Sequence, residues 1–211
     1  MRILCFGDSI TQGLWGVEGG WVERLRKHYD ALSIADLDNM QPEVFNLGVS
    51  GDTTRSLLAR IEAETKARTW KRDLPVVAVA IGANDGLFEG GRQWVNPDEF
   101  RGNLEKILRI LKPLANKVVL VGSPACDEAQ TCPVPWGDFA YTNRELQRFE
   151  QTMQEVAARH KLSFVPIYQG FKQRLDNGDA LLADGLHPND AGHRHIAEQV
   201  LPVLDTIVLA S

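Results

Sequence analysis

Three side chains of this sequence could act together as a nucleophile, a general base and the carboxylate that supports the base. Ser9 follows Gly and Asp at the end of a short apolar run, and Asp184 and His187 stand three residues apart in a turn with Gly185 and Pro188. An imidazole can take the proton of a serine hydroxyl near neutral pH, and a carboxylate beside the ring stabilises its charged form. The combination predicts nucleophilic attack on a carbonyl carbon, although each turn alone is also typical of an ordinary helix cap.

Apolar runs that end in glycine-containing turns give the elements that must position these groups. Strands are expected at residues 2–6, 43–47, 76–81, 117–121 and 163–167. Helices are expected at residues 21–29 and 54–68, from the cap at Asn96 to Lys112, from the capping box of Thr142 and Glu145, and from the cap at Asn189. This alternation predicts a single α/β domain over residues 1–211, a three-layer α/β/α arrangement. Its doubly wound parallel five-stranded sheet is expected in the strand order 2-1-3-4-5.

Such a sheet brings several turns to one edge. Ser9 follows the first strand, Gly48 follows the second, Asn84 follows the third, and the Asp184–His187 segment comes after the fifth. The carboxyl ends of parallel strands meet at one edge, where open α/β sheets bind their ligands. Gly48 and Asn84 each have a plain explanation as turn residues. Together the four turns supply a hydroxyl, a base with its carboxylate, and hydrogen-bond donors for a developing oxyanion, which favours acyl transfer.

At these turns the sequence resembles the SGNH hydrolases, also called GDSL esterases and lipases. The resemblance rests on four blocks between residues 7 and 188: Gly7-Asp8-Ser9, Asn46-Leu-Gly48-Val-Ser-Gly51, Gly82-Ala-Asn84-Asp85 and Asp184-Gly-Leu-His187-Pro188. The first block continues with Ile rather than the Leu of the family pattern. Isoleucine keeps the bulk and the apolar character at that position.

The resemblance implies a role for each of these residues. Ser9 is the expected nucleophile, His187 the base and Asp184 its partner, while the backbone N–H groups of Ser9 and Gly48 and the side-chain amide of Asn84 form the expected oxyanion hole. The implied reaction is ester hydrolysis through an acyl-enzyme, with no metal and no cofactor. A thioesterase or lysophospholipase, a sugar O-deacetylase, an acyltransferase and a non-catalytic binding module on the same fold are the alternatives.

The substrate pocket is expected beside the long irregular stretch from residue 123 to residue 141. It starts at the same sheet edge as the nucleophile, and its prolines favour a formed wall rather than a mobile lid. Candidate substrate-binding residues are Asp8, Trp15, Trp136 and Tyr141. The aromatic residues are equally compatible with packing the loop onto the domain. Because no long hydrophobic flap is present, we expect a small ester substrate with a short acyl chain, acetyl to butyryl.

Composition limits the other function classes. The chain has 211 residues, of which 44% are hydrophobic and 24% charged, and its formal net charge is −5. These values are typical of a soluble globular protein. The absence of a basic cluster argues against nucleic acid or an anionic membrane as a partner. No apolar run reaches the length of a membrane span and no signal peptide precedes the first expected strand, so a cytoplasmic location is expected.

The remaining cysteines and histidines are expected to have no catalytic role. Cys5 lies within the first expected strand and is interpreted as a small buried hydrophobe. Cys126 and Cys132 could form a disulfide, but free thiols are favoured in a reducing compartment, and no further Cys or His nearby completes a metal site. The other histidines are expected at the surface rather than as ligands: His28, His160, His193 and His195.

Overall fold

The centre of the structure is a parallel sheet. A computed structural model describes residues 1–70 and 73–209. In this part of the chain a five-stranded sheet has the order β2-β1-β3-β6-β8, which confirms the expected order 2-1-3-4-5. The strands are β1 (Arg2–Gly7), β2 (Glu43–Gly48), β3 (Val76–Ala80), β6 (Lys117–Val121) and β8 (Ser163–Val165). The expected third and fifth strands end one and two residues too late, because the chain leaves the sheet after Ala80 and Val165.

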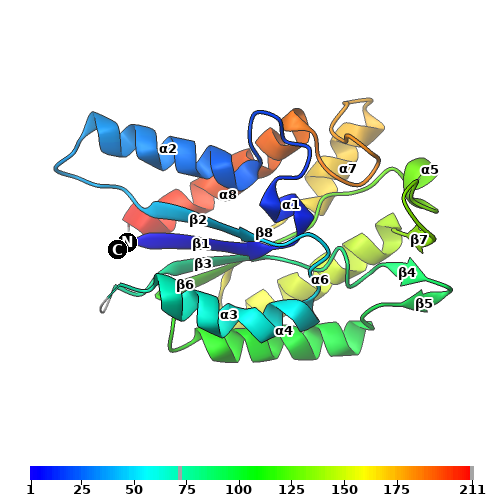
Figure 1. The fold of residues 1–211 in the computed structure, drawn as a ribbon, viewed down its shortest axis with the longest axis horizontal. Coiled ribbons are helices and arrows are strands. Elements are labelled where there is room, and N and C mark those ends of the chain that lie inside the picture. Colours follow the sequence, from blue (N-terminus) through cyan, green and yellow to red (C-terminus); the bar gives the residue numbers. More distant parts are fainter. Residues whose placement is uncertain (71–72, 210–211) are drawn as a thin grey trace.

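Helices cover both faces of this sheet (Figure 1). One face carries α2 (Trp21–Ala35), α7 (Tyr168–Asp176) and α8 (Asp190–Leu209), and the other carries α3 (Thr54–Arg68), α4 (Pro97–Leu111) and α6 (Asn143–His160). Side chains alternate along a strand. Ile3 and Cys5 therefore pack in the core beneath α2, α7 and α8, and Leu4 and Phe6 pack in the core beneath α3, α4 and α6. Both cores are continuous and apolar, which confirms the three-layer arrangement.

The helix starts agree with the capping signals in the sequence. The Asn96 side chain accepts from the Glu99 N–H at 2.9 Å and begins α4, and the Thr142 hydroxyl accepts from the Glu145 N–H to begin α6. Asn189 accepts from two backbone N–H groups at the start of α8. The α2 helix extends to Ala35, beyond the expected residues 21–29.

Short elements at the carboxyl edge of the sheet were not expected. They are α1 (Ser9–Gln12), α5 (Glu128–Thr131) and α7, together with a three-stranded antiparallel sheet of β5 (Arg92–Gln93), β4 (Phe88–Glu89) and β7 (Phe139–Ala140). The α5 helix and β7 lie within the stretch expected to be irregular. Apart from α7, which has nine residues, these elements have two to four residues and are too short to produce a hydrophobic period, and Figure 1 shows most of them beyond the strand ends.

The expectation that His193 and His195 lie at the surface is wrong. Both are buried, because the start of α8 packs beneath the loop after α1 and against α7. The Nε2 atom of His193 lies 3.1 Å from the Leu14 carbonyl oxygen, and the ring of His195 contacts the ring of Phe171. Burial lowers the pKa of both histidines. Among residues 1–70 and 73–209 no helix combines the length and the apolar character needed to span a membrane.

Candidate active site

Ser9 lies in a tight turn from β1 into the short helix α1. The Asp8 carboxylate accepts from the Ile10 N–H at 2.9 Å and caps this helix, so Ser9 is its first residue. A Cβ atom at Gly7 would lie 2.3 Å from the Ala80 carbonyl oxygen, which only glycine avoids. The turn therefore places a serine hydroxyl at the carboxyl end of a central strand, with the first N–H groups of a helix around it.

His187 and Asp184 lie within hydrogen-bond distance of this hydroxyl. Ser9 Oγ is 3.0 Å from His187 Nε2, and His187 Nδ1 is 2.8 Å from Asp184 Oδ2. A carboxylate accepts only from a ring nitrogen that carries a proton, so Nδ1 is the donor and Nε2 is left to accept from Ser9. The chain thus brings together a hydroxyl, a base and a carboxylate, although Ser9 lies 175 or more positions before Asp184 and His187 in the sequence.

Asp184 is held by its own turn. Its Oδ1 atom accepts from the backbone N–H groups of Leu186 at 3.0 Å and His187 at 2.8 Å. Burial alone would raise the pKa of Asp184, but the hydrogen bonds from His187 and Leu186 outweigh burial and lower that pKa. The side chain is therefore a carboxylate at neutral pH, oriented toward the ring.

Asn84 presents a side-chain amide that is fixed on two sides. Its Oδ1 atom accepts from the Tyr141 hydroxyl at 2.8 Å, and its Nδ2 atom donates to the Asp52 carbonyl oxygen at 2.9 Å. Asn84 and Tyr141 are both buried. An amide nitrogen carries two hydrogens, so one N–H of Asn84 remains for another acceptor.

The backbone N–H of Gly48 has an acceptor within its own turn. Its backbone N–H donates to Asn46 Oδ1 at 3.0 Å, because the asparagine side chain turns back on the backbone two residues later. A Cβ atom at Gly48 would lie 2.1 Å from the Gln12 nitrogen, so glycine is needed where α1 packs on β2. The N–H that was expected to bind an oxyanion is therefore already engaged.

Gly51, in the turn that follows, was not among the expected site residues. The Asp52 N–H donates to the Val49 carbonyl oxygen at 3.1 Å, and Gly51 has a φ of +80° within this turn, a value that favours glycine. In the ranges that the structure describes, no acceptor bonds the Gly51 N–H. Its neighbour Asp52 is the residue whose carbonyl oxygen holds the Asn84 amide. The sequence signal that could have pointed to Gly51 is the second glycine in the block from residue 46 to residue 51.

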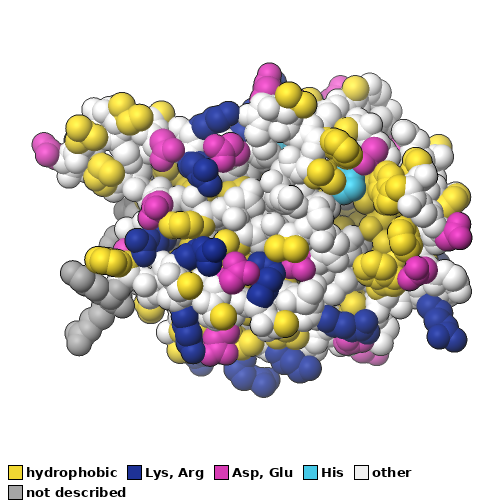
Figure 2. Space-filling view, in the orientation of Figure 1, with side chains coloured by type: hydrophobic (Ala, Val, Ile, Leu, Met, Phe, Trp, Pro, Cys, Tyr) yellow, Lys and Arg dark blue, Asp and Glu magenta, His cyan; other side chains and the backbone are white. Residues whose placement is uncertain are grey.

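The expected substrate-binding residues have different environments. Trp136 is 48% exposed, and its ring centroid lies 5.9 Å from that of His187. Trp15 is 54% exposed, and its indole N–H donates to Asp184 Oδ2 at 2.7 Å. Tyr141 is buried with its hydroxyl on Asn84. Figure 2 shows hydrophobic side chains gathered around the histidine visible beyond the strand ends.

Asp8 is unsuited to direct substrate contact. It is 3% exposed, and its carboxylate caps α1 from inside the protein. Burial raises the pKa of Asp8 to about 7, although the hydrogen bond from the Ile10 N–H opposes that rise. Its position after the strand turns the Asp8 side chain inward, which disfavours the expected contact of Asp8 with substrate.

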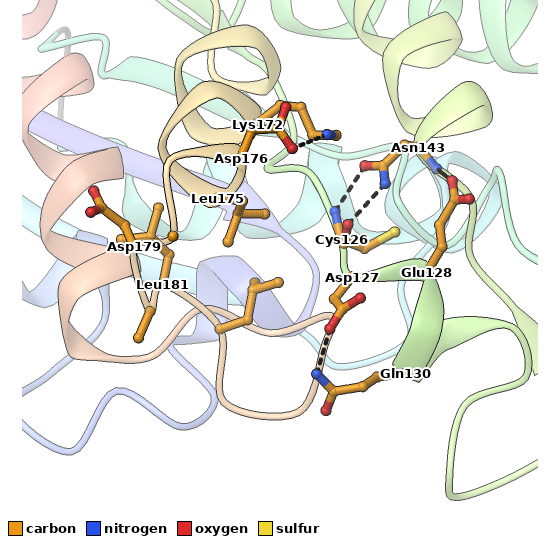
Figure 3. A pocket seen from close by; sticks show the side chains of 13 residues that line it. Cys126, Asp127, Glu128, Gln130, Asn143, Lys172, Leu175, Asp176, Asp179 and Leu181 are labelled. Carbon is orange, nitrogen blue, oxygen red and sulfur yellow. Dashed lines mark hydrogen bonds and ion pairs between the residues drawn. The ribbon is translucent and has the colours of Figure 1, made fainter.

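A cavity of about 470 Å³ lies away from these groups, between α5, the start of α6 and the end of α7 (Figure 3). Its acidic lining is already paired. Asp127 bonds Gln130, Glu128 accepts from the Asn143 N–H, and Asp176 and Asp179 pair with Lys172 and Arg174. Cys126 also lines it and is a free thiol in this structure, as is Cys132. Neither Ser9 nor His187 borders this cavity.

Comparison with known proteins gives consistent matches along the chain. A family model for the GDSL-like Lipase/Acylhydrolase family matches residues 5–195. The isoamyl acetate-hydrolyzing esterase of Saccharomyces cerevisiae is 25% identical, over 97% of this chain and 86% of that protein. Esterase TesA of Pseudomonas aeruginosa is 28% identical, over 98% of this chain and 89% of that protein.

Solved structures show the same fold. A member of the lipolytic protein G-D-S-L family from Veillonella parvula superposes with a TM-score of 0.73 at 22% identity, over 97% of this chain and 98% of that one. The acetylxylan esterase Axe2 from Geobacillus stearothermophilus superposes with a TM-score of 0.70 at 26% identity, over 95% of this chain and 92% of that one.

Proposed function

This chain belongs to the GDSL-like lipase/acylhydrolase family and is a carboxylic ester hydrolase, and we propose that it cleaves esters through a Ser9–His187–Asp184 triad and an acyl-enzyme. The observation that carries the proposal is the continuous pair of contacts from Ser9 Oγ to His187 Nε2 at 3.0 Å and from His187 Nδ1 to Asp184 Oδ2 at 2.8 Å. A hydroxyl is a weak nucleophile unless an adjacent base removes its proton, and this geometry supplies the base.

The reaction proceeds in two halves. Ser9 Oγ attacks the ester carbonyl carbon as its proton passes to His187 Nε2, and Asp184 stabilises the charged ring. The ring then gives the proton to the departing alkoxide, so an alcohol leaves and an ester of Ser9 remains. Water repeats the sequence with the same base, which releases the acid and restores the serine.

The tetrahedral intermediate carries a negative oxygen that needs donors. We assign this role to the Ser9 backbone N–H and to the N–H of Asn84 that is not bonded to Asp52. The Gly51 N–H replaces that of Gly48 as the third donor, because Gly48 donates to Asn46 whereas Gly51 adjoins the carbonyl that holds the Asn84 amide. Replacing the peptide N–H by an ester oxygen at position 51 should lower kcat, and the same exchange at position 48 should not.

The substrate class is proposed to be esters of short acyl chains. Relatives named for isoamyl acetate and for acetylxylan share this chain's family, and both names contain an acetyl ester. Trp136, beside the His187 ring, gives the mouth of the site an exposed aromatic wall. A planar apolar wall favours a compact acyl group or the apolar face of an alcohol.

A second candidate function is the removal of acetyl groups from sugars. The specific observation is a pair of half-exposed indoles, Trp136 near the His187 ring and Trp15 bonded to the Asp184 carboxylate. Aromatic faces exposed at a site can stack on the apolar face of a sugar ring. The 28% identity with the acetylxylan esterase of Xylanibacter ruminicola, over 94% of this chain and 42% of that protein, supports the same candidate.

The proposal is tested by labelling the nucleophile. A fluorophosphonate probe should label the protein once, on the peptide that contains Ser9, and Ser9→Ala should lose both labelling and ester hydrolysis. Ser50→Ala is the matched control, because Ser50 lies at the same sheet edge but bonds Gln12, and it should keep both. Turnover by a folded Ser9→Ala protein would contradict the triad and would favour a different nucleophile.

The substrate class is tested by a panel of esters. We expect the highest kcat/KM among p-nitrophenyl acetate, propionate and butyrate, with a fall toward laurate. Acetylated xylo-oligosaccharides, acyl-CoA and lysophospholipid are measured beside them. A preference for the acetylated sugar selects the deacetylase, and a preference for acyl-CoA or lysophospholipid contradicts the short-chain esterase in favour of a thioesterase or lysophospholipase.

A further inference from the structure

The backbone of Trp15 has an unusual conformation. Its φ is +64°, in the left-handed region that large side chains rarely adopt. Residues held in such conformations cluster where the surrounding structure over-determines them for a functional reason. Burial is not that reason for Trp15, since its side chain is 54% exposed.

The Trp15 side chain bonds to the carboxylate of the proposed triad. The indole N–H of Trp15 donates to Asp184 Oδ2 at 2.7 Å. The same oxygen accepts from His187 Nδ1 at 2.8 Å. A tryptophan N–H is a donor only, so it cannot compete with Asp184 for the proton of the ring, and it can only fix the carboxylate and share its negative charge.

The loop that carries Trp15 is bonded to the start of α8, which directly follows the Asp184–His187 segment. His193 Nε2 lies 3.1 Å from the Leu14 carbonyl oxygen, and Asp190 Oδ1 accepts from the Glu18 N–H at 2.8 Å. Both anchors belong to α8, which begins three residues after His187. The indole and the carboxylate are therefore positioned by one packed unit, and the contact between them does not depend on a free loop.

We propose that Trp15 is a positioning residue that holds Oδ2 of Asp184 against His187 and limits how strongly the carboxylate attracts the charged ring. This inference rests on the proposed triad. Each carboxylate oxygen of Asp184 then accepts from two donors: Oδ1 accepts from two backbone N–H groups, and Oδ2 accepts from the indole and the imidazole. Such a carboxylate keeps its orientation while the proton moves between Ser9 and His187.

The sign of the effect follows from charge sharing. A donor on Oδ2 withdraws negative charge from the atom that faces the ring, so removing the donor favours the protonated ring. The acid limb of kcat/KM, set by protonation of the base, then moves to higher pH. Among the described residues, Tyr141, from the segment after β7, interacts electrostatically with Asp184, and His193 of α8 does so with His187. Neither is altered by a change at position 15.

The test removes the indole N–H of Trp15 and keeps the rest of its ring. Incorporating 3-benzothienylalanine at position 15 keeps the bicyclic ring and exchanges the N–H for sulfur. We expect the acid limb to move to higher pH and kcat to fall roughly threefold to tenfold with little change in KM, because orientation is lost in the transition state. Trp15→Phe should move the limb in the same direction. The matched control is the same replacement at Trp94, whose indole N–H also donates to a carboxylate, Glu89 at 3.0 Å, and it should leave the limb unchanged.

Two results would overturn the inference. An unchanged acid limb and kcat in both position-15 variants would mean that the indole N–H has no catalytic effect. A change confined to KM would mean that Trp15 only lines the substrate pocket. Thermal melting identifies a variant that has lost the fold, and the benzothienyl replacement is then decisive because it preserves the ring. Failure of the triad itself is seen separately, as turnover by Ser9→Ala.

Discussion

The hydroxyl of Tyr141 donates a 2.8 Å hydrogen bond to Oδ1 of Asn84, and this contact decides which end of the amide faces the site. Tyr141 comes from the segment after β7 and Asn84 from the turn after β3, 57 positions earlier. With Oδ1 held by a donor, Nδ2 must lie on the side of the Asp52 carbonyl. This contact favours a role of the tyrosine in the proposed oxyanion hole over the expected role in the substrate pocket.

Replacing Tyr141 with Phe should lower kcat roughly tenfold and leave KM nearly unchanged. Without the tyrosine hydroxyl the Asn84 amide is no longer held in one orientation, and its N–H interacts with negative charge only in the transition state. Asn84→Ala is the reference variant, with an expected loss of roughly a hundredfold or more in kcat. The two changes should not add when combined, since both act on one amide. A Tyr141→Phe enzyme with normal kcat and a raised KM would return the residue to substrate binding.

The sequence predicted the sheet because its strands and helices carry strong local signals. The buried strands are continuous apolar runs, and the helix starts carry Asn96, Thr142 and Asn189 as caps. A topology of this kind then forces the ends of the strands to one edge. This rule places Ser9 at that edge, whereas the Asp184–His187 segment comes after α7, and the contacts to Ser9 and within the segment show that it also lies at that edge.

The details that escaped prediction depend on side-chain direction. The sequence allowed a helix cap at the Gly7–Ser9 turn, but it did not show that Asn46 would turn back to take the Gly48 N–H or that the Asp8 side chain would be buried. The donor role of the Trp15 indole and the acceptor role of Asn84 Oδ1 likewise depend on three-dimensional contacts between distant segments. Periodicity and capping rules do not contain that information.

Asp184→Asn should lower kcat by roughly a thousandfold while the protein stays folded. The amide oxygen can still accept from the Leu186 and His187 N–H groups, which keeps the turn, but the amide N–H₂ then faces the ring. A donor at that position favours the tautomer with the proton on Nε2, which cannot accept from Ser9. Unchanged circular dichroism with slow fluorophosphonate labelling is the expected result. Labelling at the normal rate would show that the ring keeps its tautomer without the carboxylate.

Asp8 should make stability depend on pH. Burial raises its pKa in the folded protein to about 7, and an aspartate in an unfolded chain titrates near about 4. The folded state then keeps a proton that the unfolded chain releases between these values, so this group lowers the free energy of unfolding as pH rises from about 4 to about 7.

Asp8→Asn removes that dependence and keeps the cap, because an amide oxygen also accepts from the Ile10 N–H. Urea unfolding should find the variant more stable than the natural chain at pH 8, by on the order of 3 kcal/mol, with the difference vanishing near pH 4. Asp36→Asn, a change at an exposed position, is the control and should leave the pH dependence unaltered. Parallel stability curves for the natural chain and Asp8→Asn would mean that the carboxyl is charged in the folded state.

Trp136 is the residue expected to set the acyl preference. Its ring centroid lies 5.9 Å from that of His187 at an interplanar angle of 36°, and it is 48% exposed, so one part of the ring covers the histidine while the rest faces the solvent. Truncation to alanine removes a wall from the mouth of the site and leaves the two cores untouched. Trp136→Ala should therefore raise kcat/KM for p-nitrophenyl octanoate relative to acetate by roughly tenfold, which corresponds to about 1.4 kcal/mol.

The melting temperature should change little, since a half-exposed ring contributes little to stability. Trp136→Phe keeps an aromatic wall and is the matched control, so it should stay close to the natural preference. The same ratio of octanoate to acetate hydrolysis in the natural chain and in Trp136→Ala would exclude the ring as the determinant of chain length. The short-acyl preference would then have to come from another part of the site, such as the 46–51 turn or the segment around Trp15.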